Sequence, residues 1–284
     1  GVLEKFGYSW KNLSKKFPKL IHGKISGFGE TGPLKDLPAY DIIVQAMGGI
    51  MSITGKNKKN MVRVGTSIGD IVSSLFCVIG ILSQIIRRTK TARGSKLDLS
   101  MLDCQVAILE NAISRYSINK INPEPIGTDH PSISPFGSFK TKNGEIVLAI
   151  GNDKLFNIFC DVINDEKLKT DKNFNNNKNR NLNLQKLRKR IEKKLKIRTT
   201  QYWIKVFSNT KIPCSEVQNI EKVIKNKQII SRKMILNYDH KLNKSIKVSS
   251  SPFNFNFVKK SSKVKPAPEL NENKNQILKY FDII

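Results

Sequence analysis

The longest apolar segment of the chain, Ile71 to Ile86, restricts the possible folds more than any other feature. Three serines and Gln84 interrupt it, so it falls short of the roughly 18 to 20 continuous apolar residues that span a bilayer. Apolar residues cover most of the circumference of a helix over Ile71 to Arg88, and the terminal basic pair suits the helix dipole. The segment therefore predicts a buried helix in the core of a soluble domain.

Strands and helices are predicted to alternate on both sides of this segment. Leu20 to Ser26 has the alternation of a strand and runs into the glycine-rich loop 27–33. Asp41 to Ser52 has helical spacing, with Asp41 as its N-terminal cap. A short strand from Lys96 to Leu99 precedes a helix from Met101 to about Tyr116. This order indicates an α/β domain.

A proline-rich segment, 123–135, marks a boundary, and a second unit follows it. Asn143-Gly144 between two strand-like runs predicts a β-hairpin of strands 137–141 and 145–150. Further predicted elements are helices 153–163, 184–197, 199–209 and 273–280, with an Asn-rich loop over 170–183 and irregular chain beyond Ser250. We expect a larger domain over 1–120, a smaller α+β domain over 121–226, and a linker with a C-terminal return to the larger domain over 227–284.

The formal net charge of the 284-residue chain is +27. Such a charge suits a nucleic-acid or anionic-membrane partner. The excess is mainly lysine, accompanied by abundant Asn and Ile, and it is spread along the chain as an AT-rich coding bias would spread it. We therefore expect neither a nucleic-acid nor a membrane partner, and a basic nucleic-acid-binding protein is kept as an alternative. Attraction of phosphorylated ligands remains a milder consequence.

Four cysteines lie far apart and form no C-x-x-C pair, so the sequence suggests neither a zinc site nor a disulfide framework. Reduced thiols are typical of a cytosol-like compartment. We expect a cytoplasmic protein, with mitochondria as the alternative.

Asp70 follows the loop Val64 to Gly69 at the start of the long apolar helix. A carboxylate at this position commonly caps a helix by accepting from its free N–H groups. It also suits a nucleophile that a glycine-containing loop leaves accessible. The local sequence by itself favours the cap.

The wider sequence resembles the family III CoA-transferases, the group of formyl-CoA, carnitine and dicarboxylate CoA-transferases. The matching segments follow one another over nearly the whole chain: Gly1–Gly7, Ile25–Pro33, Ala39–Asp41, Ser52–Gly55, Arg63–Asp70, Thr91–Gly94, Gly127–Ser132, Gly151–Asp153 and Ile212–Cys214. The resemblance implies a Rossmann-like larger domain whose N-terminal part is absent from this chain, a smaller domain, and two chains interlocked in a homodimer. Ser215-Glu216 and Glu269–Asn273 depart from the family pattern.

The resemblance implies that Asp70 attacks the thioester carbonyl of an acyl-CoA to form an aspartyl-acyl anhydride, which is covalent catalysis. The acyl-CoA and a carboxylic acid, such as succinate or glutarate, are then substrates, with no permanently bound cofactor and no metal. Aspartate is ionised near neutral pH and needs no general base. Oxyanion donors are expected in the loop from Ser26 to Gly29 and in Gly48-Gly49, although the glycine pair equally suits close helix packing.

Tyr40 separates two chemistries within the superfamily. The α-methylacyl-CoA racemases have a histidine at the matching position and use it as a base; a phenol is a poor base near neutral pH. The transferase is therefore preferred, with a 2-methylacyl-CoA racemase as the alternative. The resemblance implies CoA contacts for Lys5, Ser26, Gly27 and Tyr40, and substrate contacts for Gly48, Gly49 and His130.

Overall fold

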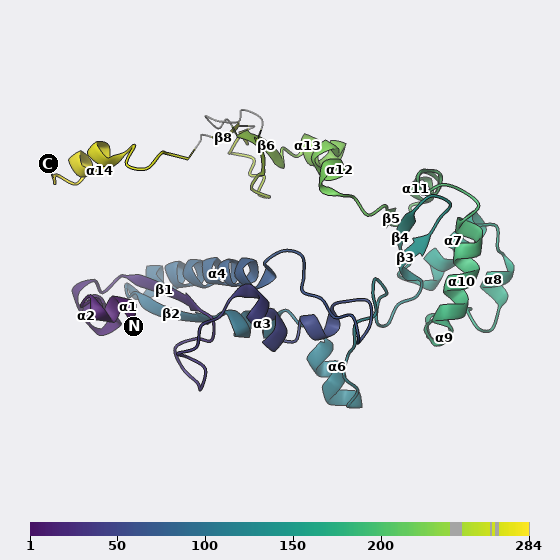
Figure 1. Cartoon of the computed structure of the whole chain (residues 1–284), viewed down its shortest axis with the longest axis horizontal. Coiled ribbons are helices and arrows are strands. Elements are labelled where there is room, and N and C mark those ends of the chain that lie inside the picture. The colour runs from purple at the N-terminus through teal and green to yellow at the C-terminus, as the bar shows by residue number, and fades with distance from the viewer. Residues whose placement is uncertain (239–245, 262, 265–266, 284) are drawn as a thin grey trace. The chain divides into compact units, whose positions relative to one another are not determined.

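The computed structural model describes residues 1–238, 246–261, 263–264 and 267–283, which form a mixed α/β protein (Figure 1). The chain divides into two compact units, Gly1–Cys214 and Ser215–Ile284. The three-part division expected from the sequence stays a prediction.

The first unit begins with two parallel strands and the helices around them. The elements are α1 (Val2–Lys5), α2 (Trp10–Lys16), β1 (Ile21–Ser26), α3 (Asp41–Met47), the 3-10 helix η1 (Met51–Ile53), α4 (Ile68–Thr91), β2 (Ser95–Ser100), α5 (Met101–Ala107) and α6 (Ala112–Asn119). β1 and β2 pair in parallel from Ile21 opposite Ser95 to Ser26 opposite Ser100. The predicted strand and helix alternation is confirmed in this part of the chain.

Two predicted helices are each divided by a residue with positive φ. The helix expected over 41–52 ends at Met47, because Gly49 has a φ of +85° and starts the turn into η1. The helix expected over 101–116 ends at Ala107, and Glu110 has a φ of +54° before α6 begins. α4 also begins two residues before Asp70.

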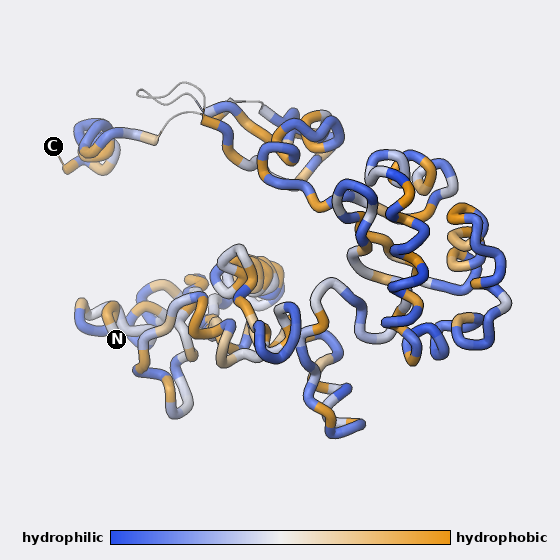
Figure 2. Tube along the Cα trace, turned by 45° about the vertical axis from the view of Figure 1, so that its right-hand side comes forward, coloured by the Kyte–Doolittle hydropathy of each residue, from blue (hydrophilic) through white to orange (hydrophobic). Residues whose placement is uncertain are grey.

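The prediction that the apolar segment 71–86 is buried is wrong for this chain. Within α4 only Gly69 and Ser73 are buried, whereas Leu75, Ile79 and Leu82 are each more than half exposed. The orange colour along the tube of α4 marks its many hydrophobic residues (Figure 2). Among the described residues, α4 is also the one helix long and apolar enough to cross a membrane, a criterion that core helices of soluble proteins also meet.

The rest of the first unit is built on the predicted hairpin, β3 (Phe136–Lys140) and β4 (Glu145–Ala149), which β5 (Cys214–Ser215) extends. Its helices are α7 (Asp153–Val162), α8 (Lys167–Thr170), α9 (Asn177–Leu182), α10 (Leu184–Leu195) and α11 (Thr200–Asn209). One hydrophobic core of sixteen buried residues lies within 139–212. The loop expected over 170–183 contains α9, because the Asn176 side chain caps this helix at Asn179.

In its described part, the second unit has three helices and three strands of its own. They are α12 (Ile220–Lys225), α13 (Lys227–Ser231), β6 (Ile235–Tyr238), β7 (Ile246–Ser249), β8 (Lys263–Val264) and α14 (Lys274–Tyr280). β6 pairs with β7 in an antiparallel manner and with β8 in a parallel manner. The predicted last helix is confirmed, and β8 is a short strand within the segment that was expected to be irregular.

Candidate active site

The glycine-rich loop begins at the carboxyl end of β1, which is where open α/β sheets commonly bind ligands. The Ser26 hydroxyl accepts a hydrogen bond from the Gly29 N–H at 3.0 Å, and the Asp98 carboxylate accepts from the Glu30 N–H at 2.9 Å. Gly27 lies against Ala39, where an added Cβ would be 2.4 Å from the alanine Cβ. The loop is thus held at several points, and the Gly29 N–H is already engaged within it.

Glu30 anchors the same loop through charge. Its carboxylate forms ion pairs with Lys96 and Lys24, the latter at 2.9 Å. Hydrogen bonds from these two ammonium groups lower the pKa of Glu30 to about 2. The loop is therefore fixed to both strands by a carboxylate that stays ionised over the physiological range.

Asp70 is the third residue of α4, and it does not cap the helix. The N-cap residue is Ser67, which makes no side-chain capping bond. Asp70 is exposed, and only its backbone oxygen is engaged, by the Ser74 hydroxyl at 2.9 Å. Within the described part of the chain, its carboxylate forms no hydrogen bond or ion pair.

A neighbouring helix supplies the capping group instead. The Asp41 Oδ1 accepts from the Gly69 N–H at 2.8 Å, although we expected Asp41 to cap its own helix. The N-cap residue of α3 is Tyr40, again without a side-chain bond. That expectation was wrong because a sequence pattern relates a polar residue only to the helix that begins beside it. The Asp41 carboxylate instead caps α4, which begins 27 residues later in the chain.

Three of the predicted site residues lie close to one another through these contacts. Gly27 contacts Ala39, the neighbour of Tyr40, and Asp41 binds the residue that precedes Asp70. The end of β1 and the N-termini of α3 and α4 therefore converge. Tyr40 is 79% exposed, so its phenol is accessible at this point.

Gly48 and Gly49 lie at the other end of α3. A Cβ added to Gly48 would be 2.5 Å from the Cβ of Gln105, so this glycine permits the close packing of α3 against α5. The Gly48 N–H donates to the Val44 carbonyl at 2.8 Å. Close helix packing accounts for Gly48, and a substrate role for the pair stays a prediction.

His130 belongs to a loop that its own ring stabilises. The Nδ1 atom accepts from the N–H groups of Ser132 and Ile133, each at 3.1 Å. A neutral ring in this arrangement has its proton on Nε2. A cleft of about 890 Å³ includes Thr128, Asp129 and Arg188 in its lining, but neither His130 nor Asp70.

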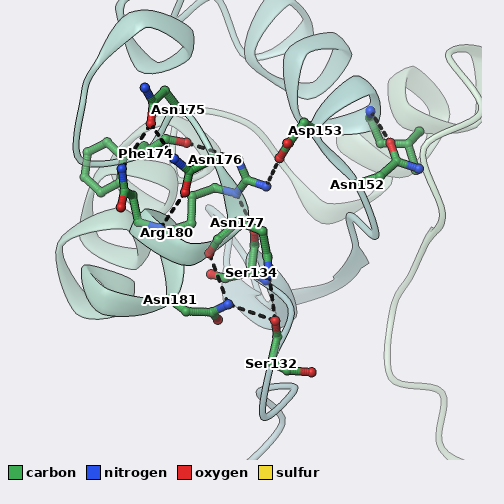
Figure 3. Close-up of polar contacts among 12 residues, drawn as sticks. Ser132, Ser134, Asn152, Asp153, Phe174, Asn175, Asn176, Asn177, Arg180 and Asn181 are labelled. Carbon is green, nitrogen blue, oxygen red and sulfur yellow. Dashed lines mark hydrogen bonds and ion pairs between the residues drawn. The ribbon is translucent and has the colours of Figure 1, made fainter.

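Side chains of α9 bind Ser132 and Ser134 in the same loop (Figure 3). Arg180 is fully buried; it donates to the Ser134 carbonyl at 2.6 Å and to the Phe174 carbonyl at 3.1 Å, and it pairs with Asp153. Asn177 and Asn181 each donate to the Ser132 carbonyl at 2.8 Å. The segments around His130 and Asp153, which we had singled out for their motifs, thus belong to one polar network centred on the buried Arg180.

The remaining predicted contact, Lys5, is exposed at the end of α1, and no contact described here joins it to Asp70. In the part of the chain that the structure describes, no three His, Cys, Asp or Glu side chains are placed to hold a metal ion. Sequence reasoning missed Gln45, although its position one turn after Asp41 on the same helix face was a usable signal.

The family model for CoA-transferase family III matches residues 1–274, so the chain belongs to that family. It is 35% identical over 237 residues to acetyl-CoA:oxalate CoA-transferase of Acetobacter aceti, covering 83% of this chain and 61% of that protein. It is 30% identical over 279 residues to succinyl-CoA:glutarate CoA-transferase of Mus musculus, covering 98% and 64%. The chain thus spans less than two thirds of the length of these curated relatives.

Solved structures with the same fold include a CaiB/BaiF family protein from Brucella suis. It matches with a TM-score of 0.83 and 27% identity, over 99% of this chain and 73% of that one. The Mycobacterium tuberculosis protein Rv3272 matches with a TM-score of 0.80 and 19% identity, over 90% and 68%, which shows the fold alone. The mixed α/β architecture is therefore that of the family.

Proposed function

We propose that the protein transfers CoA between an acyl-CoA and a carboxylic acid, with Asp70 as the nucleophile. The observation that carries this proposal is the state of Asp70: an exposed carboxylate at the start of a helix, without a partner in the described chain, whose capping role is taken by Asp41. A carboxylate that has no structural bond to break is free to attack. Family membership supports the same reaction class.

In the proposed reaction, an oxygen of Asp70 attacks the thioester carbonyl carbon, and the C–S bond breaks to release the CoA thiolate. The thiolate then attacks the aspartyl carbonyl of the mixed anhydride, which frees the donor acid and leaves an aspartyl-CoA thioester. The acceptor carboxylate repeats these two steps in reverse and leaves as its CoA thioester. Over the cycle the donor carboxylate is released, the acceptor carboxylate is consumed and the Asp70 carboxylate is regenerated, so the reaction takes up or releases no net proton.

The substrates are proposed from the relatives and from the site. The curated relatives act on oxalate and on succinate and glutarate by name, which supports a dicarboxylate donor or acceptor. Lys5, Tyr40 and the loop from Ser26 remain our proposed CoA contacts, with His130 near the acid. We also propose an interlocked homodimer, and a cytoplasmic or mitochondrial location, without a membrane or nucleic-acid partner.

The test is the variant Asp70→Asn, assayed with succinyl-CoA and a panel of dicarboxylates in the longest form of the protein that its gene encodes. We expect kcat to fall by at least about 1,000-fold, because an amide oxygen is a poor nucleophile and cannot form the anhydride. Asp161→Asn, which removes only a surface ion pair, is the matched control and should retain full activity.

Undiminished transfer in Asp70→Asn would refute the proposed mechanism. Exchange of an α-proton of a 2-methylacyl-CoA with solvent, without CoA transfer, would instead identify a racemase. A salt-sensitive nucleic-acid complex that survives Asp70→Ala, in a protein without CoA transfer, would identify a binding protein.

A further inference from the structure

Three consecutive hydrogen bonds connect α3 to both ends of the segment 64–69 that precedes the nucleophile. The Val64 N–H donates to Gln45 Oε1 at 2.9 Å, and Gln45 Nε2 donates to Asp41 Oδ2 at 2.8 Å. The Gly69 N–H donates to Asp41 Oδ1 at 2.8 Å. Asp41 and Gln45 are one turn apart on the same face of α3, so one helix holds the segment at two points.

These groups have little freedom to move. Gln45 is fully buried, and both ends of its amide are engaged in the bonds just described. Gly69 is buried as well; an added Cβ would lie 2.8 Å from Val44 Cγ2 and 3.0 Å from Asp41 Oδ1. Loss of either hydrogen bond of the Gln45 amide would leave a buried polar atom without a partner, which costs stability.

The capping of α4 and the proposed nucleophilic attack fall to two different carboxylates, those of Asp41 and Asp70. The first N–H groups of a helix have no partner within it, and a nearby side chain commonly satisfies one of them. Asp41 does this for α4 from a different helix, and the Asp70 carboxylate is left without a structural role. The backbone that leads into residue 70 is nevertheless held on both sides of Gly69, because Asp41 binds the Gly69 N–H and the Ser73 hydroxyl donates to the Gly69 carbonyl at 2.6 Å.

We propose that Asp41 and Gln45 are positioning residues that hold Gly69, and through it Asp70, in the place required for attack on the thioester. This inference rests on the proposed function. Neither side chain is proposed to touch the substrate. Their contribution is the orientation of the nucleophile, for which misplacement by about 1 Å can cost 100-fold in rate.

The directions of the three bonds allow a double-variant test. In Asp41→Asn, the new amide donor meets the amide donor of Gln45, so one bond is lost in either orientation of Asn. In Gln45→Glu, two carboxylates face each other. In Asp41→Asn/Gln45→Glu, the asparagine oxygen accepts from Gly69, its amide donates to the glutamate, and the glutamate accepts from Val64, so that all three bonds return.

We expect each single variant to lower kcat for CoA transfer by about 10- to 100-fold with KM changed by less than about threefold, since the nucleophile and not substrate binding is affected. The kcat of the double variant should be at least about tenfold higher than that of the less active single variant. Asp161→Asn serves as the control, and the midpoint of thermal unfolding is measured for every variant.

The inference would be overturned if the wild-type protein transfers CoA and both single variants do so with the wild-type kcat. The inference would also be overturned by a double variant that does not fold, or by one that folds but has no higher kcat than the less active single variant. Either result counts against the inference even where a single variant fails to fold. These results differ from failure of the proposed function, which would appear as wild-type protein without CoA transfer or as an active Asp70→Asn variant.

Discussion

Two regions of the first unit bury their apolar residues to different extents. The hairpin region, residues 136–214, contains all sixteen members of the hydrophobic core. The strand–helix region, residues 10–120, buries only the hydrophobic side chains of Val44, Ile50 and Cys104 among its described residues. The candidate nucleophile thus lies in the region with the smaller core.

The difference shows which region is stabilised by its own contacts. Burial of apolar surface contributes about 25 cal/mol per Å², so the hairpin region gains most of its stability from within. In the strand–helix region, one face of α4 remains in contact with solvent, with Leu75 58% and Ile86 63% exposed. That region is built around polar anchors such as Glu30 and Asp41 more than around a core.

The largest expected effect comes from replacing an isoleucine with alanine in one helix of each region. Ile191→Ala in α10 removes a fully buried side chain, and we expect the free energy of unfolding to fall by about 2 to 5 kcal/mol. Ile79→Ala in α4 removes a side chain that is 58% exposed, and should cost less than about 1 kcal/mol. Chemical denaturation of this chain measures both; equal losses would show that the two regions do not differ as described.

A smaller effect is expected from the buried arginine of the hairpin region. Arg180→Met leaves the carbonyls of Ser134 and Phe174 without their donor and should cost about 3 kcal/mol. Arg87→Met, an exposed change in α4, is the control and should stay within about 0.5 kcal/mol. A loss for Arg180→Met no larger than for its control would mean that the network of Figure 3 contributes little stability.

The smallest expected effect is the pH-dependent contribution of Glu30, in the strand–helix region, to the free energy of unfolding. The folded-state pKa of Glu30 is about 2, below the ordinary value of about 4.3, so its stabilising effect is present above pH 5 and is lost as the pH falls toward 2. Glu30→Gln should therefore lower the free energy of unfolding by about 1 kcal/mol at pH 7, and the difference from wild type should narrow below pH 4. A difference that is constant from pH 7 to pH 3 would contradict this assignment.

Much of the fold follows from local patterns. β1, β2 and the hairpin were predicted because alternation and an Asn-Gly turn are local signals. The division of two helices at Gly49 and Glu110 was not, and neither was α9 in its Asn-rich surroundings. The exposure of α4 could not be predicted, since an apolar helix has the same pattern whether or not other elements cover it.

The motifs also selected residues that lie near one another. Asp70, Ser26, Gly27 and Tyr40 come from elements that converge, while their roles in catalysis and binding stay predictions. The bond from Gly69 to Asp41 spans 28 positions in the sequence, so no local rule connects its partners. Capping between helices, and with it the part played by Gln45, becomes visible only in three dimensions.

The parallel pair of β1 and β2 has a consequence for the behaviour of the chain in solution. In the described residues each strand has one neighbour, so the outer edge of each presents backbone groups that another chain can pair with, which favours aggregation. A net charge of +27 opposes such pairing because like-charged chains repel one another. The excess of lysine, whatever its origin, thus helps to keep an open-edged sheet dispersed, and this protection weakens as salt is added.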